Sequence, residues 1–356
     1  MGAAPITASL VSGQPTLTPG AEAGDSLATS SKILNIIYKY RLTKLADAHD
    51  KWIEGTPKFL HTIGHFVKAQ KTIRMCLPAF PFKSANHKSK VLGPLPDKAE
   101  EIALARLNTM CTEIGLVYKP GAKLLLISDG LVYNDLLTIP DKDVWAYGEE
   151  LRAIAARTCE HIEFSRLRDL VDIQLPTQLE EITYVANASN FRRALLNQFG
   201  RDGVNIRQEI LENEDTRLTY CGYTRFLEND LRHAFPLSNS RSGSKYRRDV
   251  KFVAREMIGR GIAFAGAVKK NFPDYLRLSI HQSTGEHKIS LSLLPTKTSF
   301  TTPWHCSVAF RADGTLTSGP RGQFEADPTF EIAYVDGRAS YFREKKDSDI
   351  LSENRG

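Results

Sequence analysis

Residues 121–137, GAKLLLISDGLVYNDLL, decide the fold of this chain. A Pro-Gly turn opens an apolar run of three leucines and an isoleucine in which apolar and polar residues do not alternate. Such a run is typical of a strand buried on both faces, as in a parallel sheet covered by helices. It ends at Ser128-Asp129-Gly130, and ligands of open α/β sheets bind beyond the carboxyl ends of the strands. Ser128 and Asp129 are therefore candidate ligand-binding residues, although both residue types also shape turns and cap helices.

The neighbouring segments predict βαβ units around this strand. Residues 72–77 form a second apolar strand, and residues 97–118 have the periodicity of an amphipathic helix between the two strands. A further helix over residues 141–158 follows Pro140 and has an acidic first turn, and residues 161–164 form a short strand. This order predicts an α/β fold with a Rossmann-like, mainly parallel sheet flanked by helices.

The last third of the chain changes character. Residues 275–281 and 287–295 alternate apolar and polar side chains across a Ser-Thr-Gly turn, which predicts an antiparallel hairpin. A strand from His305 and two further hairpin-like segments follow. We therefore expect a C-terminal antiparallel β-hairpin region after the parallel sheet.

Composition divides the chain into a catalytic domain with a tail at each end. Residues 1–30 are rich in Ala, Gly, Ser, Thr and Pro and are expected to be a disordered tail, with the first helix capped by Ser30-Ser31. Residues 31–345 are expected to form the α/β catalytic domain, and residues 346–356 a polar tail or linker.

Bulk composition favours a small anionic ligand. The 356 residues carry a net charge of +6, which favours phosphates and carboxylates but is too weak for a dedicated nucleic-acid binder. The five scattered cysteines form no metal or disulfide motif, and no stretch reads as a signal peptide or a membrane span. We expect a cytoplasmic protein that binds neither nucleic acid nor a membrane.

Several enzyme classes lack their motifs here. The sequence has no G-x-G-x-x-G after a strand, no Walker A motif and no G-x-S-x-G elbow. It does have a proline-stiffened loop with Lys83 and Ser84, and a Ser/Gly-rich loop that opens a basic helix at Ser244. A helix N-terminus beside cations suits a phosphate group, although a solvated basic face is the ordinary alternative.

Several segments, in order, resemble the pyoverdine/dityrosine biosynthesis family, whose best-known members are isocyanide synthases. These segments are FPFKS (80–84), KVLG (90–93), PGAKLLLISDG (120–130), DVWAYGEELR (143–152), SKYRR (244–248), RLSIH (277–281), KISLSLLP (288–295) and PWH (303–305).

The resemblance implies a reaction and its partners. The amine of an L-amino acid would condense with the ketone of ribulose 5-phosphate, and carbon–carbon cleavage would leave the sugar's second carbon on nitrogen as an isocyanide. The family is not known to need a metal or a nicotinamide cofactor. A fused or separate downstream tailoring enzyme would use the product in secondary metabolism.

Under this resemblance, each candidate side chain has an expected role. We expect the catalytic residues, which transfer protons or orient the reacting groups, to be Lys83, Asp129, His281 and His305. Histidines suit this role because they exchange protons near neutral pH. Lys83 is also a candidate phosphate ligand and a candidate Schiff-base former. We expect the two anionic groups of the substrates to be bound by Ser84, Ser128, Arg225, Ser244, Lys245, Arg248, Lys251 and Arg277.

Two alternatives remain open. An N-formyl amino acid, as in spore-wall dityrosine formation, is the other product that the resemblance allows. A non-catalytic protein that binds a phosphorylated ligand is the alternative from a different class.

Overall fold

The structure, a computed structural model, describes residues 19–42, 50–128, 130–174, 179–201, 203–232 and 241–345. Within these residues, five strands form an all-parallel sheet in the order β3-β2-β1-β4-β5, which confirms the predicted fold class. The strands are β1 (Ile73–Pro78), β2 (Ala122–Ile127), β3 (Ile162–Ser165), β4 (Leu276–Ser279) and β5 (Ile289–Ser290).

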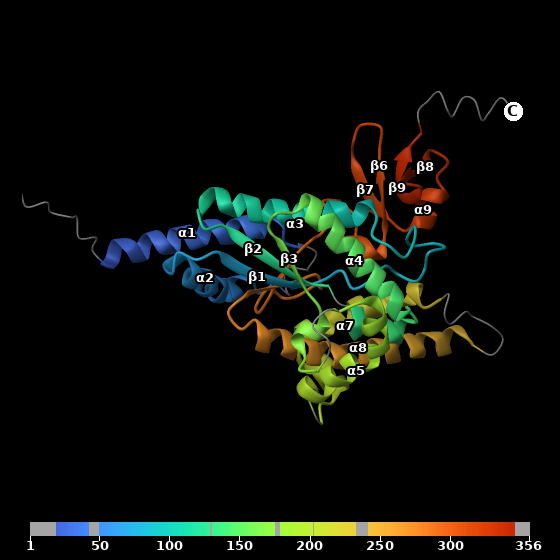
Figure 1. Ribbon diagram of the computed structural model, residues 1–356, viewed down its shortest axis with the longest axis horizontal. Coiled ribbons are helices and arrows are strands. Elements are labelled where there is room, and N and C mark those ends of the chain that lie inside the picture. The colour runs from blue at the N-terminus through green and yellow to red at the C-terminus, as the bar shows by residue number, and fades with distance from the viewer. Residues whose placement is uncertain are drawn as a thin grey trace, which may run out of the picture.

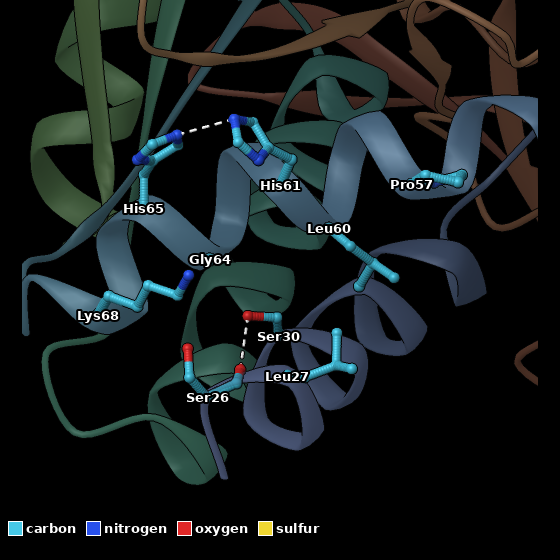
Figure 2. Close-up of a pocket in the computed structure, with 9 residues that line it drawn as sticks. All are labelled: Ser26, Leu27, Ser30, Pro57, Leu60, His61, Gly64, His65 and Lys68. Atoms are coloured by element: carbon cyan, nitrogen blue, oxygen red, sulfur yellow. Dashed lines mark hydrogen bonds between the residues drawn. The ribbon is translucent and has the colours of Figure 1, made fainter. Parts of the chain in front are cut away.

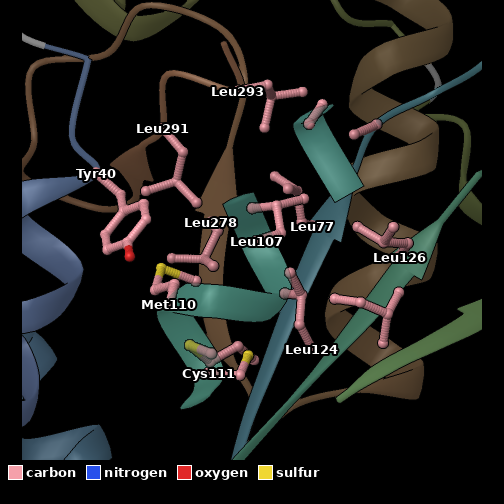
Figure 3. Close-up of a cluster of buried hydrophobic side chains, with 14 of the residues drawn as sticks. Tyr40, Leu77, Leu107, Met110, Cys111, Leu124, Leu126, Leu278, Leu291 and Leu293 are labelled. Carbon is pink, nitrogen blue, oxygen red and sulfur yellow. The ribbon is translucent and has the colours of Figure 1, made fainter. Parts of the chain in front are cut away.

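Helices cover both faces of the sheet (Figure 1). One face packs against α1 (Pro19–Lys39), α2 (Trp52–Lys68), α3 (Lys98–Val117) and α4 (Asp141–Thr158), and its core side chains come from alternate strand positions such as Leu124 and Leu126 (Figure 3). The other face, which we call the lower face, packs against α5, α7 and α8 through Cys76 and Leu125. These lower helices are α5 (Glu181–Phe199), α6 (Ile206–Glu212), α7 (Glu214–Asp230) and α8 (Gly243–Asn271).

Local sequence signals place the two crossover helices. The Asp97 side chain accepts a hydrogen bond from the Ala99 amide, and the Glu100 side chain accepts one from the Asp97 amide, which completes a capping box at the start of α3. Pro140 precedes the acidic first turn of α4. Both helices therefore begin where the sequence predicts.

A second sheet follows at the C-terminal end. It contains β6 (Ser307–Phe310), β7 (Leu316–Gly319), β8 (Phe330–Val335) and β9 (Arg338–Glu344), and α9 (Arg321–Glu325) lies between β7 and β8. The pairs β6–β7 and β8–β9 are antiparallel, as predicted for this region, whereas β6 and β9 join them in parallel.

The antiparallel hairpin predicted for residues 275–295 is wrong. Strands β4 and β5 pair in parallel, with Leu278 opposite Ile289. The connecting segment does not turn back directly but packs against the start of α2, where the Lys51 amide donates a hydrogen bond of 2.7 Å to the Thr284 carbonyl. Alternation marks a strand but not the direction of its partner, so the sequence did not reveal this detour.

The first helix also begins earlier than predicted. Helix α1 starts at Pro19, and Ser30 lies inside it and donates a hydrogen bond of 2.8 Å to the Ser26 carbonyl. The N-cap predicted at Ser30-Ser31 is therefore wrong. Among the helices that the structure describes, none is long and apolar enough to cross a bilayer.

The order of the strands fixes the position of a ligand site. The chain runs outward from β1 to β2 and β3 and then returns to place β4 on the other side of β1. Open α/β sheets bind ligands beyond the carboxyl ends of the strands at such a reversal. The site is therefore expected beyond Pro78 of β1 and Ser279 of β4.

Close backbone packing at Gly55 gives the first prediction. A Cβ atom at Gly55 of α2 would lie 2.0 Å from the Gly285 carbonyl oxygen, whereas Gly115 of α3 has open space around it. Gly55→Ala should lower the free energy of unfolding by about 1–3 kcal/mol through overpacking. Gly115→Ala, the matched control, should raise it by up to about 1 kcal/mol through helix propensity. Urea unfolding of both variants would measure this, and equal stabilisation by both would contradict the packing described.

Candidate active site

Two cations lie side by side on the lower face of the sheet. Arg277 of β4 is paired with Cys76 of β1, whose side chain belongs to the core under α7 and α8. Residues in register on parallel strands point to the same face, so Arg277 also faces these helices. The β4–β5 register, extended by one residue, sets Lys288 beside Arg277.

Neither cation has a carboxylate partner within ion-pair distance among the described residues. The guanidinium of Arg277 makes one weak contact, 3.9 Å from its Nη1 to the sulfur of Cys76. Both side chains are partly buried. By contrast, Arg74 on the same sheet face forms a paired interaction with Glu163. A buried cation without a counter-ion is costly, so this pair is suited to hold an anion.

His281 lies just beyond the carboxyl end of β4. Its imidazole packs edge-on against the buried ring of Tyr223 from α7, with the ring centroids 5.1 Å apart. Burial, together with the nearby Lys288, His305 and Arg277, lowers the pKa of His281 to about 3. The imidazole is therefore neutral at physiological pH.

His305 forms the second half of the site together with Asp230 and Lys90. Its Nδ1 lies 3.2 Å from a carboxylate oxygen of Asp230, close enough for an ion pair but not aligned for a hydrogen bond. Lys90 pairs with the other oxygen of the same carboxylate. Burial and then Lys90 lower the pKa of His305, against the opposing effect of Asp230. A neutral imidazole beside a buried carboxylate is suited to accept a proton.

Aromatic rings connect the two histidines. Phe226 of α7 packs on His305 with a centroid distance of 4.5 Å and on Tyr223 at 5.8 Å. The ring centroid of Tyr133, which follows β2, lies 6.4 Å from that of Tyr223. The hydroxyl of Ser128 is buried and has no hydrogen-bond partner in the described part of the chain. The predicted ligand-facing serine thus keeps a free hydroxyl at the carboxyl end of β2.

Lys83 lies in a separate, fully buried ion network. Its Nζ is 2.7 Å from Glu100 and 2.9 Å from Asp97, and it donates a hydrogen bond of 3.1 Å to the Pro303 carbonyl. Burial alone would lower the pKa of the Lys83 ammonium, but the two carboxylates outweigh it and raise that pKa. A charged, fully paired ammonium is a poor nucleophile, so the geometry disfavours a Schiff base at Lys83. Its bond to Pro303 instead anchors the turn that carries His305.

The remaining predicted residues lie in several places. The Ser84 amide donates to the Trp304 carbonyl, so this buried serine braces the same turn. Asp129 lies outside the described residues. Arg225 is exposed on α7, turned away from the face that carries Tyr223. The exposed cluster at the start of α8 consists of Ser244, Lys245, Arg248 and Lys251.

Sequence reasoning missed three contributors to the site. Asp230 was predicted only as part of a helix, and Lys90 and Lys288 were named only within the segments that resemble the family. A helical wheel of α7 would have placed Tyr223, Leu227 and Asp230 on one face. No local signal, however, could show that Lys288 lies beside Arg277, because that contact depends on the parallel pairing of β4 and β5.

A cavity of about 500 Å³ elsewhere lacks such a set of groups. It lies between α1 and α2, away from the carboxyl ends of the strands (Figure 2). The exposed His61 and His65 approach each other there, with 2.9 Å between their Nε2 atoms. No cluster of three or more potential metal ligands occurs in the described residues. The cavity is lined by Ser26, Leu27, Ser30, Pro57, Leu60, His61, Gly64, His65 and Lys68.

Comparisons with known proteins show which family and which solved structure the chain resembles. The family described as pyoverdine/dityrosine biosynthesis protein matches residues 63–333. The crystal structure of PvcA from Pseudomonas aeruginosa is similar to this fold with a TM-score of 0.75 and 30% identity, covering 89% of this chain and 100% of that one.

Two curated relatives are similar over most of this chain. An isocyanide synthase–NRPS hybrid, crmA of Aspergillus fumigatus, is 53% identical over 317 residues, which cover 89% of this chain but only 20% of the hybrid. An L-tyrosine isonitrile synthase of Xenorhabdus nematophila is 31% identical over 321 residues, covering 88% of this chain and 89% of that protein. The chain therefore spans about a fifth of the fungal hybrid's length.

The Lys83 network gives a prediction about stability and pH. Burial raises the pKa of Glu100 to about 7, so the folded state holds this proton more tightly than the unfolded chain does. The stabilisation from that proton is complete below the ordinary carboxyl pKa and is lost as the pH rises through about 7. Urea unfolding between pH 5 and 8 should show wild type losing stability relative to Glu100→Gln. Glu101→Gln alters the next residue of the same helix, and its free energy of unfolding should change with pH as that of wild type does. Parallel curves for all three proteins would contradict the assignment.

Proposed function

Since the chain belongs to the pyoverdine/dityrosine biosynthesis family, we propose that it is an isocyanide synthase acting on an L-amino acid with ribulose 5-phosphate as carbon donor. The observation that carries the proposal is the unpaired Arg277–Lys288 pair beside the neutral His281 and His305. Both substrates are anions, one a phosphate ester and one an α-carboxylate, and both need cations that no protein carboxylate already neutralises.

Arg277 is the proposed ligand of the amino-acid carboxylate. A guanidinium presents a planar pair of donors that matches a carboxylate, and this one makes only a weak contact with Cys76. The ring of Tyr223 and its neighbour Tyr133 would contact the amino-acid side chain. The L-tyrosine named for the Xenorhabdus relative makes an aromatic amino acid a first candidate for this chain.

His305 and His281 are the proposed proton carriers. Imine formation between the amine and the sugar ketone expels one water, and the later rearrangement moves protons on carbon. His305 beside Asp230 resembles a general base oriented by a carboxylate. His281, neutral and near both cations, would return protons to the rearranging carbon chain.

The experiment that tests the proposal is an activity assay on the purified chain. Tyrosine, tryptophan, valine and leucine would each be offered with ribulose 5-phosphate, and isocyanide would be trapped with a tetrazine. We expect isocyanide formation that depends on the sugar phosphate. An N-formyl product instead would support the dityrosine-type reaction, and no product with any amino acid would contradict both.

Two anion sites can be compared directly by mutation. Arg277→Met should raise the KM for the amino acid by roughly 10- to 100-fold, the scale of a lost charge-assisted hydrogen bond. The double variant Lys245→Ala, Arg248→Ala removes the exposed cations at the start of α8 and should change both KM values less than threefold. A larger effect of the double variant on the KM for ribulose 5-phosphate would assign the phosphate to that helix.

The pH dependence of catalysis tests the role of His305. Because its pKa lies below the ordinary histidine value, kcat/KM should fall only when the pH drops below about 6.5, where this base gains a proton. Asp230→Asn removes the charge that opposes the shift, so the acid limb should move to lower pH while kcat falls. His287→Asn alters an exposed histidine and should leave the profile unchanged. An acid limb that Asp230→Asn does not move would contradict the role.

A further inference from the structure

We propose that Lys288 forms a Schiff base with the ketone of ribulose 5-phosphate and hands the sugar to the amino acid by transimination. This inference deepens the proposed function and rests on it. It names a covalent step and the side chain that carries it.

The first support is the position of Lys288. It immediately precedes β5, and the register sets it beside Arg277 on the sheet face covered by α7 and α8. The loop between β4 and β5 also carries His281, whose ring packs under Tyr223. Lys288 is partly buried, less deeply than Lys83 and Lys90.

The second support is the absence of a close partner. Among the described residues, the Lys288 ammonium forms no ion pair and no hydrogen bond within contact distance. Two more deeply buried lysines differ: Lys83 is held by two carboxylates and Lys90 by Asp230. A lysine engaged in this way stays protonated, whereas an amine that is to attack a carbonyl must be neutral.

The surrounding charges make the Lys288 ammonium easier to deprotonate, so a cation in the resting site can supply the neutral amine when it reacts. Burial lowers the pKa of Lys288, Arg277 lowers it further, and only Asp215 acts in the opposite direction. A second cation beside a desolvated lysine is a known way to produce a nucleophilic amine. The Asp215 carboxylate is already engaged, since it accepts a hydrogen bond of 2.6 Å from the Thr284 amide.

The proposed step balances without an oxidant or reductant. The neutral Lys288 amine adds to carbon 2 of the sugar, the carbinolamine takes up one proton from the solvent and loses one water, and a protonated imine remains. The neutral amino-acid amine then adds to the same carbon, a proton moves between the two nitrogens, and the neutral Lys288 amine leaves. The product is the protonated amino-acid imine, which returns the proton to the solvent to give the imine that the proposed function requires, and the lysine is regenerated.

Borohydride trapping tests the step on the wild-type chain. The protein would be incubated with ribulose 5-phosphate alone, reduced with sodium borohydride and measured by intact mass and peptide mapping. We expect one reduced pentulose phosphate per chain, on the peptide that contains Lys288. Lys297→Arg, which alters an exposed lysine nearby, should trap equally, and Lys288→Arg should not trap. A label on other lysines only, or no label while isocyanide is formed, would overturn the inference.

Kinetics separate this role from simple anion binding. Lys288→Arg keeps the charge but cannot form an imine, so kcat should fall by on the order of 100-fold while both KM values stay within about threefold. Retained kcat in Lys288→Arg would overturn the covalent step and leave the proposed function standing. If wild type traps the sugar phosphate but makes no isocyanide with any amino acid, the proposed function fails and the Schiff base at Lys288 stands.

Discussion

Two neighbouring cations on one face of a sheet, under helices and without a carboxylate between them, are unfavourable unless an anion joins them. Arg277 and Lys288 are in this position, whereas Lys83, Lys90 and Arg74 each have a close carboxylate partner. These three cations are thus neutralised, whereas Arg277 and Lys288 at the strand reversal are not. This difference in pairing distinguishes the site from the other charged clusters on the sheet.

The buried ion pairs of Lys83 and Lys90 nonetheless contact the segments that carry the site. Lys83 ties the start of α3 to the Pro303 carbonyl, two residues before His305, and Lys90 ties the preceding loop to Asp230. The connection between β4 and β5 is fixed against α2, where Gly55 and Gly285 approach closely, and it carries His281. Each histidine therefore sits on a short segment whose position is set by buried contacts outside the site. Precise placement of proton carriers depends on such support.

The sequence predicted the parallel sheet and the crossover helices, because strand apolarity and helical periodicity are local signals. It also placed Ser128 at the carboxyl end of its strand, where the structure has it. It missed the parallel return of β5, and with it the neighbourhood of Lys288, because strand direction depends on a long-range detour over α2. The burial of Lys83 between Asp97 and Glu100 also depends on packing between distant segments, so the sequence of the Lys83 loop did not predict it.

The most direct test of this account is a crystal structure of the chain with ribulose 5-phosphate and an amino acid bound. The account predicts that the two anionic groups lie on the lower face of the sheet, that Arg277 contacts one of them, and that Lys288 lies within reach of carbon 2 of the sugar. Substrates bound instead at the first turn of α8, with Arg277 and Lys288 untouched, would contradict it.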